Sequence, residues 1–301
     1  MATLEEVKAT YDFLDDIVRV DMGDYGEVTC ALYDGDFTKT LEQAQYDKHD
    51  YILRGIKFVE GARVLDVGCG WGPFLKTVRD RGGRSVGLTL SPKQVEACAR
   101  NGLNVRLMDW KSIDVETFGS FDGIVSVGAF EHFCPVDEYL AGEQERVYDR
   151  FFDLCRRLLP PGGRLYLQTM LWGKNAPAYP DISLHARKGS NEYILAVLEK
   201  AYPGSWLPAG EEQVVRCAAP YFRVVSRNNG RKDYIETMNQ WDRVWTWGPT
   251  KVLPALKLLP YFLTDHDFRY KIESLRNGYN KQCFIREVMD HQRMVFEATG
   301  N

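Results

Sequence analysis

The sequence predicts an α/β protein in which a doubly wound, Rossmann-like sheet of seven strands carries a helical cap and helical lid insertions. Short apolar runs alternate with runs of helical period across residues 57–172, which is typical of parallel strands joined by crossover helices. A glycine-rich turn, residues 68–72, joins the first strand to a helix. Strand patterns at residues 222–226 and 293–297 bring the number of strands to seven.

The central part of the chain supplies most of the elements. The expected strands are residues 63–67, 84–89, 104–108, 121–127 and 163–170. Helices are expected near residues 73–81, 92–101 and 144–159. A Pro-Pro-Gly-Gly run at residues 160–163 ends the last of these helices and turns the chain. Right-handed crossovers then place the carboxyl ends of the strands, and any ligand, along one edge of the sheet.

The flanking segments predict how the chain is divided. Residues 1–56 contain two helical patterns, so we expect an N-terminal helical cap ahead of a core domain spanning residues 57–301. Proline- and glycine-rich sequence surrounds one helix near residues 173–212, which indicates an insertion over the site. A second insertion is expected near residues 231–287. Packing of the first helices on the core, without a capping role, is the plainer alternative for the N-terminal segment.

Composition excludes several classes of function. The 301 residues are 45 % apolar and 27 % charged, and the net charge of −4 argues against a nucleic-acid groove. Seven scattered cysteines without C-x-x-C spacing predict no metal site, and they suggest reduced thiols in the cytoplasm. No apolar run is long enough to span a membrane. The proline-broken run at residues 252–263 suits a buried helix or a peripheral membrane contact. The oligomeric state stays open, a homo-oligomer included.

The glycine turn predicts a nucleotide-type ligand. Asp66 directly precedes glycines at positions 68, 70 and 72, and a new helix then points its free N–H groups at the ligand. A dinucleotide fingerprint would place the third glycine one position later and an acid after the second strand. An acid before G-x-G-x-G is instead the pattern of proteins that bind S-adenosylmethionine (SAM). A tight turn without any ligand is the alternative.

Polar and aromatic side chains follow the next two strands. Thr89, Ser91 and Gln94 could hold ribose hydroxyls, although Ser91 also suits an N-cap ahead of Pro92. Asp109 and Trp110 follow the third strand, where a carboxylate accepts from an adenine amino group and an indole covers the ring. These side chains extend the predicted cofactor site along the edge of the sheet.

A carboxylate beside an imidazole follows the fourth strand, at Glu131 and His132. Such a pair usually lies on the surface, but the end of a buried strand is where the acceptor of a transferred group would lie. An aromatic cluster contains Tyr234, Trp241 and the tryptophans at positions 245 and 247. It suits an ordinary core equally well as a site whose ring faces stabilise a cation.

These stretches together resemble the cyclopropane fatty acid synthase family of SAM methyltransferases, and most closely its mycolic-acid cyclopropane synthase branch. The resemblance rests on T-L-E-Q-A-Q at residues 40–45, the turn at 65–72, the second strand at 86–91, G-A-F-E-H-F at 128–133, residues 157–160, and Tyr234 seven residues before Trp241. The glycine turn is shared by most methyltransferases, whereas the first and fourth stretches are far more specific.

The resemblance implies a SAM-dependent alkylation of an unsaturated acyl chain, with a cyclopropane or methyl product. The expected cofactor-binding residues are Tyr11, Thr29, Asp66, Gly68, Gly70, Gly72, Thr89, Ser91, Gln94, Asp109 and Trp110. The family also holds a bicarbonate ion that acts as a base. The expected catalytic residues are Cys30, Glu131, His132, Tyr234 and Gln168.

Gln168 stands where the family has a histidine, and Val28 stands where an aromatic residue is common. Glutamine can hydrogen-bond to an anion but cannot carry a proton charge. Three alternatives therefore stay open. The chain could methylate carbon or nitrogen in a small molecule, as other members of the branch do. It could also be a SAM-binding regulatory protein or a lipid-binding module, and turnover of SAM would separate these two from an enzyme.

Overall fold

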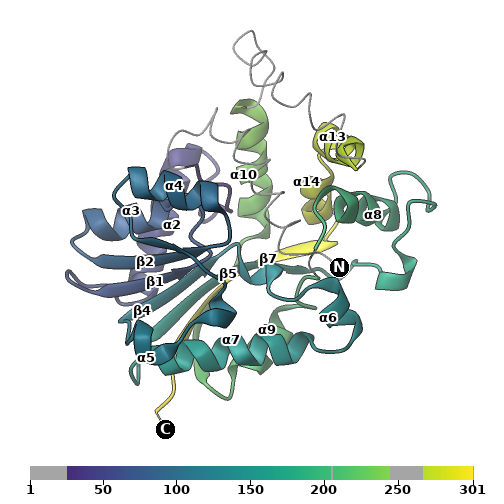
Figure 1. Ribbon diagram of the computed structural model, residues 1–301. Coiled ribbons are helices and arrows are strands. Elements are labelled where there is room, and N and C mark those ends of the chain that lie inside the picture. Colours follow the sequence, from purple (N-terminus) through teal and green to yellow (C-terminus); the bar gives the residue numbers. More distant parts are fainter. Residues whose placement is uncertain (1–25, 205, 245–266, 301) are drawn as a thin grey trace.

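The computed structural model describes residues 26–204, 206–244 and 267–300. Within these residues seven strands form one sheet in the order β3-β2-β1-β4-β5-β7-β6 (Figure 1). The strands are β1 (Arg63–Val67), β2 (Arg84–Thr89), β3 (Val105–Leu107), β4 (Gly123–Val127), β5 (Arg164–Trp172), β6 (Phe222–Asn229) and β7 (Met289–Ala298). Strands β1 to β5 pair in parallel, and β7 runs antiparallel between β5 and β6. The predicted doubly wound sheet is therefore confirmed.

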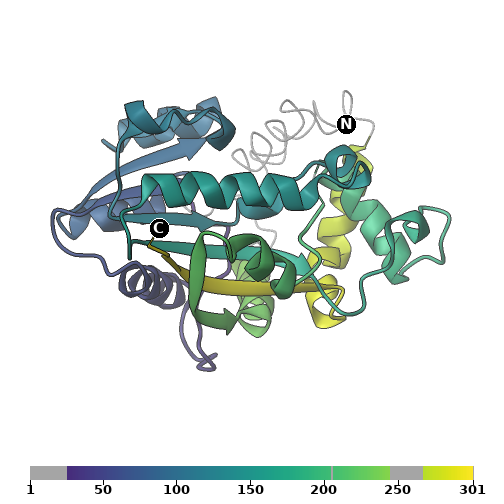
Figure 2. The same cartoon turned by 90° about the horizontal axis from the view of Figure 1, so that it is seen from below.

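Helices cover both faces of the sheet (Figures 1 and 2). One face carries α2 (Leu41–Gly55), α3 (Pro73–Asp80) and α4 (Pro92–Arg100). The other carries α5 (Val115–Phe118), α7 (Gln144–Leu158) and α9 (Glu211–Ala218), with α6 (Val136–Leu140) beside them. Beyond the end of β5 lie α8 (Asn191–Ala201), α10 (Arg231–Val244), α13 (Phe268–Asn277) and α14 (Tyr279–Ile285). Short 3-10 turns occur at η1 (Trp110–Ser112), η2 (Phe130–His132) and η3 (Tyr179–Asp181).

Alternating strand residues fill two separate cores. On the α7 face, Leu65, Ile124 and Leu167 pack with the fully buried Phe151 and Phe152 of α7. On the α2 face a smaller core consists of Ile52, Leu53, Ile56, Val64, Phe74, Val78, Val125, Tyr166 and Val295. Burial of the strands on both faces explains why their sequences read as almost continuous apolar runs.

The crossovers run in opposite directions from the centre of the sheet. After β1 the chain adds β2 and β3 on one side, and it then returns to place β4 and β5 on the other. A crevice therefore opens at the carboxyl ends of β1 and β4, where ligands bind in open α/β sheets. Helix starts match the sequence signals: Ser91 accepts from the backbone N–H of Gln94, and Pro92 begins α4.

Two expected elements differ in extent. Strand β5 continues to Trp172 and β7 already begins at Met289, because the two strands pair over nine residues each. The run at residues 252–263 lies outside the described residues, as does the whole of the first helical pattern of the N-terminal segment. None of the helices that the structure describes has the length and hydropathy that crossing a bilayer requires.

Candidate active site

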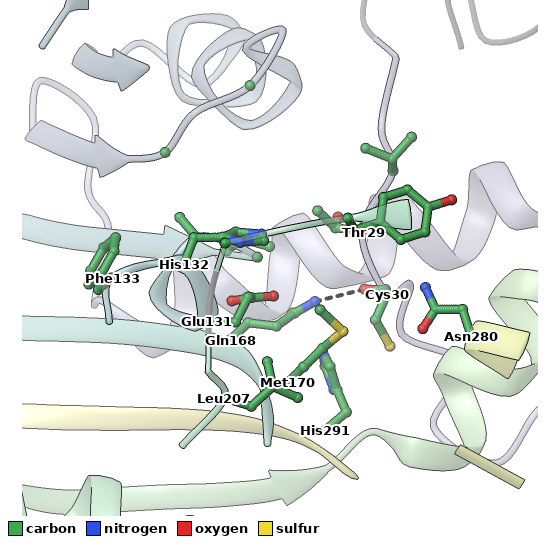
Figure 3. A pocket seen from close by; sticks show the side chains of 18 of the residues that line it. Thr29, Cys30, Glu131, His132, Phe133, Gln168, Met170, Leu207, Asn280 and His291 are labelled. Atoms are coloured by element: carbon green, nitrogen blue, oxygen red, sulfur yellow. Dashed lines mark hydrogen bonds between the residues drawn. The ribbon is translucent and has the colours of Figure 1, made fainter. Parts of the chain in front are cut away.

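A cavity of about 610 Å³ opens at the carboxyl ends of the strands. Its first part, which we call the glycine-loop half, is lined by residues at or shortly after the carboxyl ends of β1, β2 and β3. Its second part, which we call the β5–β7 half, is lined by residues of strands β5 and β7. Residues 26–30, η2, α8, α10 and α14 complete the lining. Figure 3 shows the second part, where Glu131, Gln168, Met170 and His291 surround one space below Cys30.

The glycine turn brings backbone close to the cavity. Gly68 has a φ of 88°, and a Cβ atom there would lie 2.3 Å from the Cβ of Ala129. Gly70 has a φ of 54° and nothing within 4 Å of the place where a Cβ would be, so its backbone faces open space. Gly72 adopts a φ of 77° at the start of α3 but does not line the cavity. Gly68 thus lets Ala129 pack against the main chain, and Gly70 leaves room for a ligand beside it.

Two buried polar atoms in the glycine-loop half have no hydrogen-bond partner among the residues that the structure describes. One is Oδ1 of Asp66, which is 4 % exposed, and the other is Nε2 of Gln94, which is 2 % exposed. Burial, and then the charge of Glu27, raises the pKa of Asp66 to about 7. An unpartnered buried polar atom costs about 1–3 kcal/mol, so a cationic donor beside Asp66 and an oxygen beside Gln94 would stabilise the site. Thr89 holds the oxygen of the Gln94 amide.

The remaining predicted cofactor residues differ in position. Asp109 and Trp110 line the cavity; Asp109 also caps η1, and the indole packs 5.1 Å from the ring of Phe133. Thr29 lines it too. Ser91 does not, because its side chain is buried while capping α4. Tyr11 lies outside the described residues.

A buried ion cluster below the glycine-loop half was not anticipated. The ammonium group of Lys48 contacts Glu27 and donates to Oγ1 of Thr29 and Oε1 of Gln45, each at 2.6 Å. Nε2 of His49 lies 3.1 Å from the same Glu27 carboxylate. Burial alone would raise the pKa of Glu27, but His49 and Lys48 hold it at about 2. The cluster fixes residues 26–30 against α2, and polar residues on the core-facing side of that helix were its only sequence signal.

Glu131 is the buried carboxylate of the β5–β7 half. It is 3 % exposed, and its Oε2 lies 3.0 Å from Oγ1 of Thr169 on β5. Burial raises the pKa of Glu131 to about 7, while the Thr169 hydroxyl and backbone N–H groups act in the opposite direction. The neighbouring His132 is exposed toward the cavity, and the surrounding protein lowers the pKa of its imidazole to about 4. Near neutral pH, Glu131 can therefore both release and accept a proton.

Gln168 and Cys30 are joined to each other. Nε2 of Gln168 donates to the backbone oxygen of Cys30 at 2.9 Å, and its Oε1 accepts from Tyr166 at 3.0 Å (Figure 3). Burial raises the pKa of the Cys30 thiol to about 12 despite the guanidinium of Arg293, so the thiol stays protonated. Gln168 therefore already uses both ends of its amide. Tyr234 lines the cavity from α10 with 9 % exposure.

The walls of the β5–β7 half are mainly apolar. They include Met170, Trp172, Leu195, Leu198, Trp206, Leu207, Met238, Trp241 and Met289. The rings of Trp172 and Trp206 lie 4.6 Å apart. Of the predicted aromatic cluster, Tyr234 and Trp241 line the cavity, whereas positions 245 and 247 lie outside the described residues. His291 of β7 is a further lining residue that the sequence patterns did not indicate.

Comparisons with known proteins agree on one family. A family model described as mycolic acid cyclopropane synthetase matches residues 1–250. Cyclopropane mycolic acid synthase 1 of Mycobacterium tuberculosis (strain ATCC 25618 / H37Rv) is 33 % identical over 245 residues, which cover 78 % of this chain and 79 % of that protein. Hydroxymycolate synthase MmaA4 of the same organism is 29 % identical over 246 residues, covering 79 % and 76 %.

The fold is similar to that of a solved structure from the same group. The crystal structure of mycolic acid cyclopropane synthase CmaA1, complexed with SAH and CTAB, aligns with a TM-score of 0.74. The two chains are 27 % identical, and the alignment covers 98 % of each. The similarity thus extends over the whole sheet and the helices around it.

Proposed function

This chain belongs to the mycolic acid cyclopropane synthetase family, and from that premise we propose that it alkylates the double bond of an unsaturated acyl chain and closes a cyclopropane ring. It is a SAM-dependent methyltransferase of that family. The observation that carries the proposal is a buried carboxylate, Glu131, with a pKa of about 7, facing an apolar cavity that continues into the glycine-loop half.

The glycine-loop half fits SAM. We propose that the unpartnered Oδ1 of Asp66 accepts from the ammonium of the cofactor and that Nε2 of Gln94 donates to a ribose oxygen. Gly70 leaves the backbone open to the ligand, and Trp110 offers an indole wall for the adenine. Bound SAM supplies an activated methyl group, so the protein's main task is to align the acceptor for in-line attack.

The β5–β7 half suits an acyl chain. Its walls are mainly methionine, leucine and tryptophan side chains, which favour apolar surface. The ring faces of Tyr234 and Trp241 suit a developing positive charge. These features favour a lipid over the small-molecule acceptors of related methyltransferases.

We assign the proton to Glu131. In the proposed reaction the π electrons of the double bond form the new bond to the methyl carbon as the sulfur–carbon bond breaks. The resulting cation loses a proton from the delivered methyl group, and the electron pair of that C–H bond closes the ring. Glu131, ionised above its pKa of about 7, accepts the proton, and the hydroxyl of Thr169 orients the carboxylate.

A bicarbonate ion also fits this half of the cavity. Cys30, Glu131 and Tyr234 line the same space, as the family resemblance requires. Gln168 contributes less than expected, because its amide already bonds Tyr166 and the Cys30 backbone. When bound, the ion would add an anionic base to the site.

Location and assembly remain proposals. We place the reaction in the cytoplasm, because all seven cysteines are buried free thiols. Peripheral membrane contact through residues 252–263 and formation of a homo-oligomer stay predictions.

The test is transfer of radiolabelled methyl groups from SAM to vesicles of unsaturated phospholipid and to an unsaturated acyl carrier protein. Vesicles of the corresponding saturated phospholipid are the matched control. The proposal expects label only in the unsaturated acyl chains. Label in the saturated lipid, or in a headgroup amine, would overturn it.

A further inference from the structure

His291 lies on the same face of the sheet as Gln168, two residue pairs further along the β5–β7 pairing. It is directly opposite Met170 in the antiparallel pairing of β7 with β5, as Arg293 is opposite Gln168. Opposed residues project from the same face, so the imidazole enters the β5–β7 half beside Met170 (Figure 3). The side chain is only 2 % exposed. Its position follows from pairing between strands more than 100 residues apart in sequence.

The surroundings of His291 decide which ring nitrogen carries the proton. Nδ1 is buried and has no hydrogen-bond partner among the described residues. A Cβ at Gly230 would lie 2.4 Å from Nδ1 and 2.7 Å from Nη1 of Arg293, so this nitrogen faces backbone and a guanidinium. A buried N–H without an acceptor is rare, and the positive charge favours a lone pair on that side. The single N–H of the neutral ring therefore belongs on Nε2.

The ring also stays neutral. Burial, then the charges of Arg293 and Lys48, holds the pKa of His291 well below its usual value. The Tyr234 ring packs edge-on against it, with centroids 5.3 Å apart. Arg293 itself does not line the cavity; it pairs with Asp233 at 2.9 Å and donates to Asn228 and to the backbone of Ala31. His291 is thus a fixed, neutral hydrogen-bond donor at the cavity wall.

We propose that Nε2–H of His291 donates a hydrogen bond to a bicarbonate ion held beside Glu131, and so provides the donor that Gln168 does not. His291 is then a positioning residue rather than the base. The inference rests on the proposed function, because it assumes that an anion helps to receive the proton. The role of hydrogen-bond donor to the anion thus passes from Gln168 on β5 to His291 on β7.

Nuclear magnetic resonance of histidine side chains tests this without turnover. Sodium bicarbonate is added to the complex of the 15N-labelled protein with SAH. The signals of His291 are assigned as those that are absent from the spectrum of His291→Gln. We expect an Nε2-protonated neutral ring between pH 6 and 8 that shifts on titration with bicarbonate. An Nδ1-protonated ring, or signals that bicarbonate does not move, would overturn the proposal.

Turnover in buffer depleted of carbon dioxide and then titrated with bicarbonate gives the second readout. His291→Leu removes the donor and should raise the half-saturating bicarbonate concentration about tenfold or more, as expected for one charge-assisted hydrogen bond. His291→Gln keeps an N–H donor and should stay within about threefold of wild type. The exposed His185, which does not line the cavity, provides the control His185→Gln.

The outcomes separate this inference from the proposed function. If wild type gives no lipid product, the proposed acceptor is wrong. The resonance experiment then tests, without turnover, whether His291 binds bicarbonate. If wild type is active and His291→Leu responds to bicarbonate as wild type does, His291 has no such role. If His291→Leu fails to fold, the bicarbonate titration of the wild-type His291 resonances decides: a shift supports the donor role, and signals that bicarbonate does not move overturn it.

Discussion

The two halves of the cavity differ in how the chain builds them. The glycine-loop half consists of residues at or shortly after the carboxyl ends of β1, β2 and β3, so each side chain is placed by the nearest strand. In the β5–β7 half, Cys30, Glu131, Tyr234 and His291 come from four distant segments. The proposed cofactor site therefore depends on residues close to the strand ends in sequence. The proposed acceptor site depends on distant segments that meet only in the folded protein. Variants in one half should leave the function of the other unchanged.

Glu131→Gln gives the largest expected effect. The amide keeps the shape of the carboxylate but cannot accept the proton, so turnover should fall by about 10²–10⁴-fold. SAM affinity, measured by calorimetry, should stay within about twofold of wild type because the glycine-loop half is intact. Glu96→Gln at an exposed position of α4 is the matched control. Turnover comparable to wild type in Glu131→Gln would remove that carboxylate from the mechanism.

Asp66→Asn should affect the other half alone. Losing a charge-assisted hydrogen bond to the cofactor ammonium should weaken SAM binding about 10- to 100-fold, while turnover at saturating SAM stays near wild type. An unchanged dissociation constant would show that Asp66 does not hold the cofactor.

The same variant has a stability signature in the ligand-free protein. Because burial raises the pKa of Asp66 from 3.8 to about 7, the folded state favours the protonated form, and stability is lost as pH rises through that interval. The Asp66→Asn side chain cannot ionise. The melting temperature of the variant minus that of wild type should therefore be larger at pH 8 than at pH 5. Equal differences at the two pH values would contradict the raised pKa.

The pH dependence of turnover should report Glu131. The carboxylate must be ionised to accept a proton, so the rate at saturating substrates should fall about tenfold per pH unit below a pH of about 7. SAM binding measured over the same pH range shows whether titration of Asp66 contributes to this fall in rate. A rate that is flat from pH 5 to 8 would rule out Glu131 as the base.

Thr169→Val gives the smallest effect. Its hydroxyl lies 3.0 Å from Glu131 and stabilises the ionised carboxylate. Removing the hydroxyl should raise the pH below which turnover falls by less than about one pH unit. Turnover at pH 8.5 should change little. A downward shift of that pH would mean that the hydroxyl stabilises the protonated form instead.

Local signals account for what the sequence could predict. Alternating runs, helix caps such as Ser91 and the glycine turn identified the doubly wound sheet and most of the glycine-loop half. Ser91 and Gly72 were expected to bind cofactor from their places in the two motifs, but neither lines the cavity: Ser91 caps α4 and Gly72 precedes α3. His291 and the Lys48–Glu27 pair carried no usable pattern, since their environments arise from segments that meet only in the folded protein.

The most direct test of ring formation uses SAM with a fully deuterated methyl group and an unsaturated acyl lipid, with the product analysed by mass spectrometry. Ring closure removes one hydrogen from the delivered methyl group, so the account predicts a product that retains two of the three deuterium atoms. A product that retains all three would show simple methylation and would contradict the proton transfer assigned to Glu131.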